Sequence, residues 1–356
     1  MYRVVVADDS PTVRHLLAAI VGGSHDLSVV GLAADGDEAV ELVRRYRPDV
    51  VLMDIRMPRV DGFEATGRIM RECPTPIVLI TGHADARDAD ASARALGLGA
   101  LWVLRKPPGP GQPGFDAASR EIVAIVKAMA GVRVAPRPGG PSSASRGRPG
   151  LRAPIPRPLG GHHGPLAVAA STGGPAALVQ ILGALPARFP VPVLIVQHIS
   201  PGFVGSFAAA LDRASKVRVK VAEQHEPLSA GVAYVAPDGA HLGVTAKGTV
   251  LLSEAPPLEG FRPSATHLFL SVAEAFGAGA VALILTGMGH DGVAGLRALR
   301  QAGGLVLGQD EATSVVYGMP GVAAREGLVD RELALPAIAG TLKEVFDGDD
   351  EWHPPA

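Results

Sequence analysis

Short apolar runs alternate with longer segments of helical period along most of this sequence, and the alternation limits the folds that the chain can adopt. In residues 1–130 each run has the length of a strand and is rich in Val, Ile or Leu. The predicted strands are 2–7, 27–33, 50–53, 77–81 and 100–104, and the predicted helices are 13–21, 37–46, 62–71, 91–96 and 119–129. Because parallel strands are joined by crossover helices, five such units predict a doubly wound α/β domain.

The same alternation resumes after residue 164, and it predicts a second α/β domain over residues 165–346. Further strands are expected near Leu166, Val193, Val217, Gly231, Val281 and Gly304, with hairpin-like strands between residues 235 and 252. We therefore expect a second doubly wound sheet that is mostly parallel. A length of 356 residues also favours two domains.

The segment 131–164 separates the two predicted domains. It is rich in Pro, Gly and Arg, contains no acidic residue and has no apolar periodicity, so it cannot repay its ordering entropy by burial. We interpret it as an interdomain linker, although its arginines could instead dock on an acidic partner. Residues 347–356 form an acidic tail that contains proline.

The composition excludes several classes of function. With 47% hydrophobic residues the chain can build buried cores, and its formal net charge of −2 gives no general attraction to nucleic acid or to anionic membranes. Cys73 is the only cysteine, which rules out an intramolecular disulfide. No apolar stretch approaches the roughly 20 residues that cross a bilayer, and the start of the chain lacks the layout of a secretory signal. We expect a cytoplasmic protein without membrane insertion.

Acidic, hydroxyl and cationic residues follow the strands of the first predicted domain. Asp8 and Asp9 end the first strand, Asp54 the third, Thr81 the fourth and Lys106 the fifth. In open α/β sheets ligands lie beyond the carboxyl ends of the strands, so these groups should converge. Hard oxygen ligands suit Mg²⁺, and a metal ion with a lysine would neutralise a phosphoryl group during its transfer to a carboxylate.

These residues, with the stretches 52–58 (Leu-Met-Asp-Ile-Arg-Met-Pro) and 61–62 (Asp-Gly), resemble the receiver domain of two-component response regulators. The resemblance covers residues 1–130 and implies a flavodoxin-like (βα)5 fold in which Asp54 accepts a phosphoryl group from a histidine kinase. It also implies that Asp9, Asp54 and the Arg56 carbonyl bind Mg²⁺ directly, while Asp8 acts mainly through water.

The resemblance to receiver domains further implies that Thr81 and Lys106 are the switch residues that respond to phosphorylation. One position departs from the usual pattern. Receivers commonly carry an aromatic switch residue three positions before the lysine, but this sequence has Val103 there, with Trp102 beside it. Coupling of an aromatic ring flip to Thr81 is therefore not expected.

A serine, a histidine and an aspartate follow three strands of the second predicted domain. Ser171 stands between an apolar run and two glycines, His198 ends the next apolar run, and Asp291 follows a later run and a glycine-rich turn. A serine hydroxyl becomes a nucleophile when a base takes its proton, and the base needs a third group to fix its tautomer. The three residues fit these roles.

The sequence of the second domain is open to two other interpretations. An α/β-hydrolase is disfavoured, because Ala169 replaces the first glycine of the nucleophile elbow and the chain order is Ser, His, Asp. Residues 287–292 form a literal G-x-G-x-x-G, with Asp310 downstream as a candidate ribose-binding acid of a dinucleotide-binding domain. Against this, the motif comes late in the domain, and Asp291 would place negative charge inside the phosphate cradle.

Several motifs in residues 165–345 resemble the chemotaxis protein-glutamate methylesterase family, CheB. The motifs are 170–174 (Ala-Ser-Thr-Gly-Gly), 197–198 (Gln-His), 261–264 (Phe-Arg-Pro-Ser), 286–292 (Thr-Gly-Met-Gly-His-Asp-Gly) and 309–320 (Gln-Asp-Glu-Ala-Thr-Ser-Val-Val-Tyr-Gly-Met-Pro). A receiver placed before this domain is also the architecture of that family. One departure follows the third motif, where the family commonly continues Val-Asp and this chain has Ala265-Thr-His267.

The resemblance to CheB implies hydrolysis of glutamate methyl esters on chemoreceptors, and often deamidation of receptor glutamines. It implies that Ser171 attacks, that His198 moves the proton and that Asp291 orients His198. The Met288 amide would be the oxyanion donor, and Thr172 would help to hold His198. No cofactor is expected for the esterase reaction, and the protein is expected to be a monomer. The competing class is a non-catalytic adaptor joined to a receiver.

Overall fold

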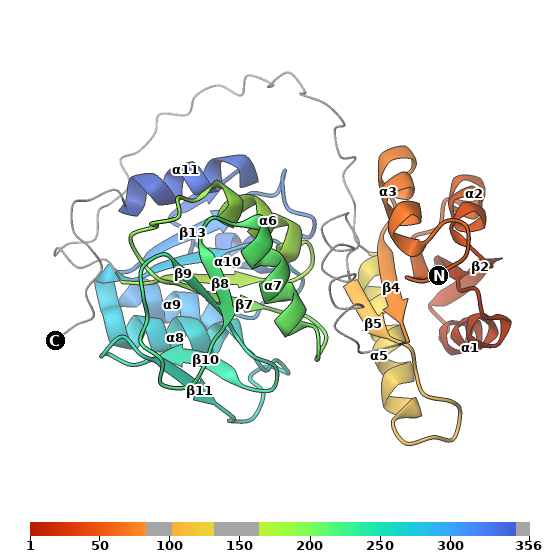
Figure 1. Cartoon of the computed structure of the whole chain (residues 1–356), viewed down its shortest axis with the longest axis horizontal. Coiled ribbons are helices and arrows are strands. Elements are labelled where there is room, and N and C mark those ends of the chain that lie inside the picture. Colours follow the sequence, from red (N-terminus) through yellow and green to blue (C-terminus); the bar gives the residue numbers. More distant parts are fainter. Residues whose placement is uncertain (83–101, 132–163, 347–356) are drawn as a thin grey trace. The chain divides into compact units, whose positions relative to one another are not determined.

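The computed structural model describes residues 1–82, 102–131 and 164–346 (Figure 1). The chain forms two compact units, Met1–Gly147 and Arg148–Ala356, which are described separately. The predicted linker apart from Gly131 and Gly164, the predicted helix 91–96 and the predicted tail 347–356 lie outside the described residues.

The first unit is a five-stranded parallel sheet with the strand order β2-β1-β3-β4-β5. Its strands are β1 (Tyr2–Ala7), β2 (Leu27–Ala33), β3 (Val50–Asp54), β4 (Ile77–Thr81) and β5 (Trp102–Arg105), and its described helices are α1 (Pro11–Gly22), α2 (Gly36–Tyr46), α3 (Gly62–Glu72) and α5 (Phe115–Ala130). Helix α1 contacts α5 and α2 contacts α3, as expected for two helical layers around one sheet. The predicted doubly wound fold is confirmed.

Three of these helices begin at residues that their sequences identify as caps. The side chains of Ser10, Asp35 and Asp61 accept hydrogen bonds from the amides of Val13, Glu38 and Glu64, and so satisfy N–H groups that have no partner within the helix. Each cap follows a strand closely, so the strand ends are held near the helix starts. This arrangement gathers the polar residues of the first unit at one edge of the sheet.

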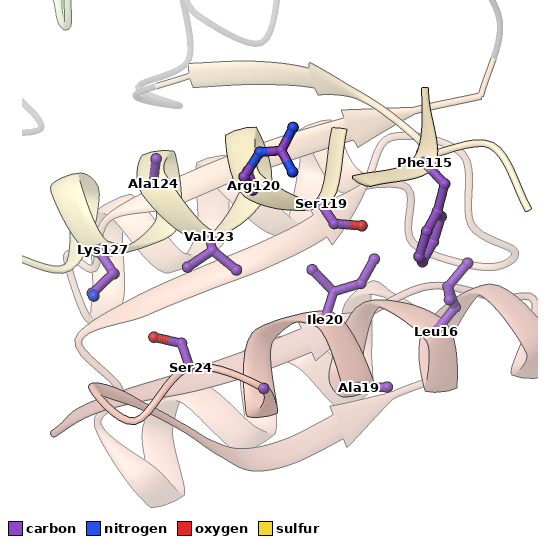
Figure 2. A pocket seen from close by; sticks show the side chains of 11 residues that line it. Leu16, Ala19, Ile20, Ser24, Phe115, Ser119, Arg120, Val123, Ala124 and Lys127 are labelled. Atoms are coloured by element: carbon purple, nitrogen blue, oxygen red, sulfur yellow. The ribbon is translucent and has the colours of Figure 1, made fainter. Parts of the chain in front are cut away.

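A cavity of about 690 Å³ lies between α1 and α5 (Figure 2). Its wall is mainly apolar, with Leu16 and Ile20 from α1 and Phe115 and Val123 from α5, and Lys127 lies at one end. None of its lining residues belongs to either of the predicted sites.

The second unit contains a seven-stranded parallel sheet with the order β14-β13-β12-β6-β7-β9-β8 and a separate antiparallel hairpin, β10-β11. The strands are β6 (Leu166–Ala170), β7 (Val193–Gln197), β8 (Arg218–Val221), β9 (Val232–Val235), β10 (His241–Val244), β11 (Val250–Ser253), β12 (Val281–Ile284), β13 (Leu305–Gln309) and β14 (Arg331–Leu333). The helices are α6 (Gly174–Ala184), α7 (Val204–Ala214), α8 (Ala265–Phe276), the 3-10 turn η1 (Gly277–Gly279), α9 (Val293–Gln301), α10 (Met319–Arg325) and α11 (Leu335–Phe346).

Alternate residues of each central strand face opposite layers of this unit. In β6, Leu166 and Val168 pack in the cluster that includes α6, α7 and α11, whereas Ala167 and Ala169 pack against α8, α9, α10 and the hairpin. Figure 1 shows these helices covering the two faces of the sheet. Because both faces are buried, the central strands are apolar apart from the glutamines that end β7 and β13, which is why they are recognisable as continuous runs.

The predicted strands of the second unit are confirmed, with two differences. The hairpin is β10-β11, and Val235, which was expected to start it, belongs to the parallel strand β9. Strand β14 was not predicted, because it has three residues and two of them are charged. Such a strand has no apolar run, and its pairing with β13 depends on the sheet already being present. No helix in the described ranges is both long and apolar enough to cross a bilayer.

We expect Ile181→Ala to lower the free energy of unfolding of the second unit by about 2–5 kcal/mol, because it empties space in the α6 side of the core. Ile181 is 2% exposed, whereas Val179 on the same helix is 37% exposed and provides the control. Val179→Ala should cost less than about 1 kcal/mol. Urea denaturation of the full chain, followed by circular dichroism, measures both. Equal losses would contradict the packing described for α6.

Candidate functional site

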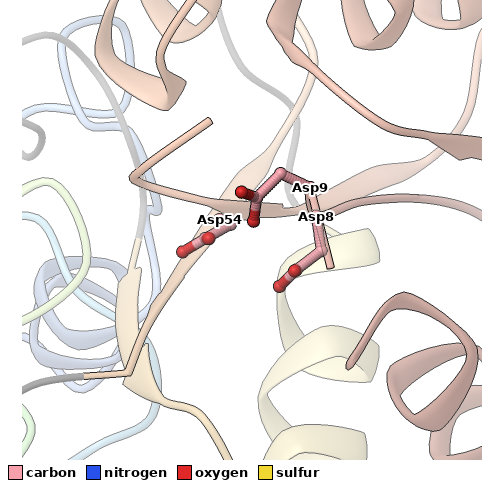
Figure 3. Close-up of side chains that lie close together, drawn as sticks. All are labelled: Asp8, Asp9 and Asp54. Atoms are coloured by element: carbon pink, nitrogen blue, oxygen red, sulfur yellow. The ribbon is translucent and has the colours of Figure 1, made fainter. Parts of the chain in front are cut away.

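Three carboxylates meet at the carboxyl edge of the first sheet. Asp8 and Asp9 follow β1 and Asp54 ends β3, and one carboxylate oxygen from each lies within 4.8 Å of those of the other two (Figure 3). Asp8 and Asp54 are buried, whereas Asp9 is exposed. Three hard oxygen ligands in this arrangement fit a Mg²⁺ ion, which commonly takes one or two carboxylates and retains several waters. The structure thus brings the three predicted acidic ligands together.

Lys106 provides the positive charge of this cluster. Its Nζ lies 2.8 Å from Asp8 Oδ2 and 2.8 Å from Asp54 Oδ2. Burial lowers the pKa of Lys106, but the hydrogen bonds and charges of the two aspartates outweigh it and raise the pKa. Burial raises the pKa of Asp54, and Lys106 offsets this only in part. The ammonium group therefore remains charged beside an incompletely stabilised carboxylate.

The remaining residues predicted for the first site lie at the neighbouring strand ends. Thr81 ends β4 and is buried. Its carbonyl accepts a backbone hydrogen bond from the Lys106 amide, with an N···O distance of 2.7 Å. Arg56 is exposed and lies two residues beyond the end of β3. Val103 is buried in β5 and pairs with Leu79, so the usual position of the aromatic switch residue is filled by a core side chain.

Ser171 lies in the tight turn between β6 and α6. Its amide donates to the Thr286 carbonyl at 3.1 Å, and its own carbonyl accepts from Gly174 at 2.8 Å. Gly173 has a φ of 82°, which favours glycine. A Cβ atom on Gly174 would lie 2.2 Å from Gln197 Oε1, so the start of α6 approaches the end of β7 too closely for a side chain. The turn places Ser171 at the carboxyl edge of the sheet, as predicted.

His198 lies directly beside this turn. Strand β7 pairs with β6 so that Gln197 is opposite Ala170, and the His198 amide donates to the Ala170 carbonyl at 2.9 Å. The Gln197 side-chain amide donates to the carbonyls of Ser171 and His198, at 2.9 and 2.8 Å. Gln197 therefore fixes the backbone of both residues. In the sequence Gln197 is recognisable only as part of the motif 197–198, and its role in fixing the backbone is not.

Asp291 and His198 form a buried pair. Asp291 Oδ2 lies 2.9 Å from His198 Nε2, and both side chains are at most 5% exposed. The other imidazole nitrogen, Nδ1, is buried and has no hydrogen-bond partner in the described structure. No hydrogen bond therefore joins His198 to the Ser171 hydroxyl. The aspartate binds Nε2, whereas in the serine-protease arrangement it binds Nδ1.

The start of α8 holds the Asp291 carboxylate. Ser264 Oγ donates to Oδ1 at 2.8 Å, and the amides of Ala265 and Thr266 donate at 2.7 and 3.0 Å. Burial raises the pKa of Asp291, but the hydrogen bond and charge of His198 and these two amides outweigh it and lower the pKa from 3.8 to about 2. Asp291 is thus a stable anion at a helix N-terminus.

Two of these contacts involve residues to which the sequence analysis gave no role. The helix cap at Ser264 could have been found from the sequence, since a serine precedes an apolar helix there, but its bond to Asp291 could not. Phe261 stacks on His198 with ring centroids 4.2 Å apart and 9° between the planes. Thr266 belongs to the stretch 265–267 that departs from the family pattern. Its hydroxyl accepts a hydrogen bond from the Gly292 amide at 2.9 Å and so connects α8 to the turn that carries Asp291.

The turn after β12 packs against Ser171. A Cβ atom on Gly287 would lie 2.8 Å from Ser171 Cβ, so this glycine allows the close approach. Thr286 Oγ1 donates to the Thr172 carbonyl at 2.9 Å and joins the two turns. The neighbouring Met288 is 43% exposed, and its amide makes no hydrogen bond within the described residues. The Met288 N–H, the predicted oxyanion donor, therefore has no partner within the described residues and follows the glycine that approaches Ser171.

Thr172 makes no side-chain hydrogen bond to His198 within the described residues. Its hydroxyl is buried and has no hydrogen-bond partner in the described part of the chain. The residue instead contributes its backbone carbonyl, which accepts from Thr286. Its neighbour Ser171 faces the Gly287 turn, so the local backbone bonds determine the position of Thr172. Support of His198 by Thr172 therefore stays a prediction, and a hydrogen bond from the Thr172 hydroxyl is not its means in this structure.

The G-x-G-x-x-G motif at 287–292 does not have the geometry of a dinucleotide site. Its Asp291 carboxylate is occupied by α8 and His198. The proposed ribose-binding acid, Asp310, accepts from the amide of Thr313 at 3.0 Å and also binds the Thr313 hydroxyl, so it caps its own turn. The motif provides a turn between β12 and α9 that places Asp291.

Both units of the chain match known protein families. Residues 4–112 match the family model for the response regulator receiver domain, and residues 166–342 match that for CheB methylesterase. A protein-glutamate methylesterase/protein-glutamine glutaminase of Myxococcus xanthus is 51% identical over 97% of each chain. One from Anaeromyxobacter dehalogenans is 50% identical over 96% of this chain and 98% of its own length.

A solved structure gives the same result for the second unit. The CheB methylesterase catalytic domain of Thermotoga maritima is 38% identical and matches with a TM-score of 0.50, covering 51% of this chain and 98% of that domain. The match is thus close to complete for that single domain. This chain belongs to the CheB methylesterase family and carries a response regulator receiver domain before the methylesterase domain.

Proposed function

We propose that this protein hydrolyses methyl esters of glutamate side chains on chemoreceptors, and deamidates receptor glutamines, under the control of phosphorylation at Asp54. The observation that carries the proposal is the buried His198–Asp291 pair, which lies beside the Ser171 turn in a chain of this family. Buried, coupled ionisable groups at the carboxyl edge of a parallel sheet are the usual components of such sites.

His198 is the general base, through Nδ1. The ionised Asp291 accepts a hydrogen bond at Nε2, so Nε2 carries the proton and Nδ1 has the free lone pair. Ser171 Oγ attacks the ester carbonyl carbon while its proton moves to Nδ1. The serine–histidine hydrogen bond is expected to form with substrate bound, because catalytic hydrogen bonds often tighten only in that complex.

Charge then develops on the carbonyl oxygen and is stabilised by the Met288 amide. This donor is part of the backbone and is held near Ser171 by the Gly287 contact, so it needs little reorganisation during the reaction. The tetrahedral intermediate collapses when Nδ1 returns the proton to the methoxy oxygen and methanol leaves. Water, deprotonated by the same nitrogen, hydrolyses the acyl-enzyme to free glutamate. With a glutamine substrate the leaving group is ammonia.

The first unit controls access to this site. Asp54 accepts the phosphoryl group from a histidine kinase. Asp9, Asp54 and the Arg56 carbonyl would bind Mg²⁺ directly, Asp8 would act mainly through water, and Thr81 and Lys106 would contact the phosphoryl oxygens. Mg²⁺ offsets the negative charge that gathers there. In the unphosphorylated protein the receiver covers the esterase site, and the added charge weakens that docking. A single cysteine suits the reducing cytoplasm, where the receptor signalling segments and the kinase are found.

Ser171→Ala should reduce methanol release from a methylated receptor fragment by at least about 1,000-fold, because the nucleophile is lost. Its circular dichroism spectrum should match that of the natural chain, since no side-chain hydrogen bond of Ser171 is lost. Gas chromatography of methanol measures the rate. Equal release from both proteins would show that the second unit is a non-catalytic adaptor.

Asp291→Asn should lower kcat by about 10,000-fold, because the imidazole loses the carboxylate that fixes its tautomer. The pKa of Asp291 is lowered from 3.8 to about 2, so the natural carboxylate is ionised at every pH above about 4 and is protonated only as the pH falls toward 2. The acidic limb of the rate profile must therefore belong to another group. An acidic limb centred between pH 2 and 4 would contradict this assignment.

Deleting residues 1–130 should raise basal esterase activity by about 5-fold to 150-fold, because it removes the domain that covers the site. In the full chain a small-molecule phosphodonor with Mg²⁺ should give a similar increase, and Asp54→Asn or removal of Mg²⁺ with a chelator should abolish it. Methanol release and radiolabelled phosphate on Asp54 are the readouts. If the deletion left basal activity unchanged or lower, occlusion would be the wrong mechanism.

A further inference from the structure

The site loop, residues 254–264, connects β11 to α8 and contacts both partners of the His198–Asp291 pair. Phe261 stacks on the His198 imidazole at 4.2 Å between centroids, and Ser264 Oγ donates to Asp291 at 2.8 Å. One loop thus covers a face of the base and holds the carboxylate. A displacement of the loop would change both contacts together.

The tip of the site loop is a small turn of its own. Leu258 and Phe261 exchange two backbone hydrogen bonds, at 3.1 and 2.9 Å. Between them Glu259 and Gly260 both have positive φ, 51° and 87°, as in a two-residue hairpin turn of type I′. Arg262 donates to the Glu254 carbonyl at 3.0 Å, but this contact is exposed. The turn determines where Phe261 lies within the loop. At its tip Glu259 Oε2 lies 3.8 Å from His290 Nε2, and both side chains are exposed.

A single buried imidazole connects the two ends of the site loop. His241, the first residue of β10, is 0% exposed. Its Nδ1 lies 3.2 Å from the Ser264 amide and its Nε2 lies 3.2 Å from the Pro256 carbonyl. An amide can only donate and a carbonyl can only accept, so Nδ1 is the acceptor and Nε2 carries the proton. The neutral imidazole therefore closes the loop on its buried side.

We propose that His241 is a positioning residue of the esterase reaction, which acts by closing the site loop on the His198–Asp291 pair. A hydrogen-bonded series runs from Pro256 through His241 to Ser264, and from Ser264 through Asp291 to His198. The inference rests on the proposed function, because it concerns the geometry of its base. His241 touches neither substrate nor reacting atoms.

His267 provides a matched comparison. It stacks on His241 with centroids 4.8 Å apart and 14° between the planes, and its Nδ1 lies 3.3 Å from the Leu242 carbonyl. Burial lowers the pKa of His267, and the Leu242 carbonyl opposes this. Within the described residues its imidazole packs against His241 but makes no hydrogen bond to the site loop.

The test compares variants of the full chain, activated by a phosphodonor, in the methanol-release assay. His241→Leu should lower kcat by about 100-fold with KM changed by less than about 3-fold, because the catalytic groups lose their alignment while the outer groove remains. His267→Leu should leave kcat within about 2-fold of the natural chain. In the NMR spectrum, the downfield proton of the His198–Asp291 hydrogen bond should shift in His241→Leu but not in His267→Leu.

A second pair of variants tests the two ring nitrogens and does not depend on whether His241→Leu folds. In His241→Asn the amide oxygen takes the place of Nδ1 and can accept from Ser264, whereas in His241→Gln the amide nitrogen takes the place of Nε2 and can donate only to Pro256. The Asn variant should therefore have a kcat about 10-fold higher than the Gln variant.

Two results would overturn the inference: equal kcat in the Asn and Gln variants, or equal loss in His241→Leu and His267→Leu. Neither result would affect the proposed function, which Ser171→Ala tests in the same assay. If the natural chain released no methanol, the proposed function would fail, and the NMR comparison would still decide whether His241 controls the His198–Asp291 hydrogen bond.

Discussion

The Asp291 carboxylate connects the folding of the methylesterase domain to its chemistry. It lies on the turn after β12, accepts two amides and a hydroxyl from the start of α8, and binds His198 at the end of β7. An anion at a helix N-terminus stabilises that helix. Here the amides of the helix N-terminus in turn offset the free-energy cost of burying the Asp291 charge. Three elements that are distant in sequence therefore depend on one negative charge. Without the carboxylate, the first amides of α8 would lose their hydrogen-bond acceptor, and the His198 imidazole would lose the contact that orients it.

The receiver domain uses a buried carboxylate in the opposite way. Asp54 ends a central strand with Lys106 as its charged partner, and burial raises its pKa despite this nearby cation. Asp291 is held as an anion by donors that are fixed in the fold, with a pKa of about 2. The difference suits their proposed roles. A carboxylate that must react is left incompletely stabilised, and one that must only orient a neighbour is fully hydrogen-bonded.

The positions of the main site residues could be predicted because parallel strands bring their carboxyl ends together. That rule placed Asp54 beside Lys106 and Ser171 beside His198. The ring nitrogen that binds Asp291 could not be predicted, because it depends on the orientation of a side chain. The hydrogen bonds of Ser264 to Asp291 and to His241 could not be predicted either, because these partners are 27 and 23 residues away in the sequence and meet only in the tertiary fold. For Thr172 the sequence indicated proximity to the site but not the direction of its hydroxyl.

The close contact between Gly174 and Gln197 links two positions that carry no chemistry of their own. Gln197 fixes the backbone of Ser171 and His198, and its amide oxygen fills the space that a side chain at 174 would need. A side chain at position 174 would therefore collide with Gln197, and its Cβ atom would also lie 2.7 Å from Ala170 Cβ. A library designed to adapt this enzyme to new esters should keep glycine at 174, because any other residue there would displace the serine turn.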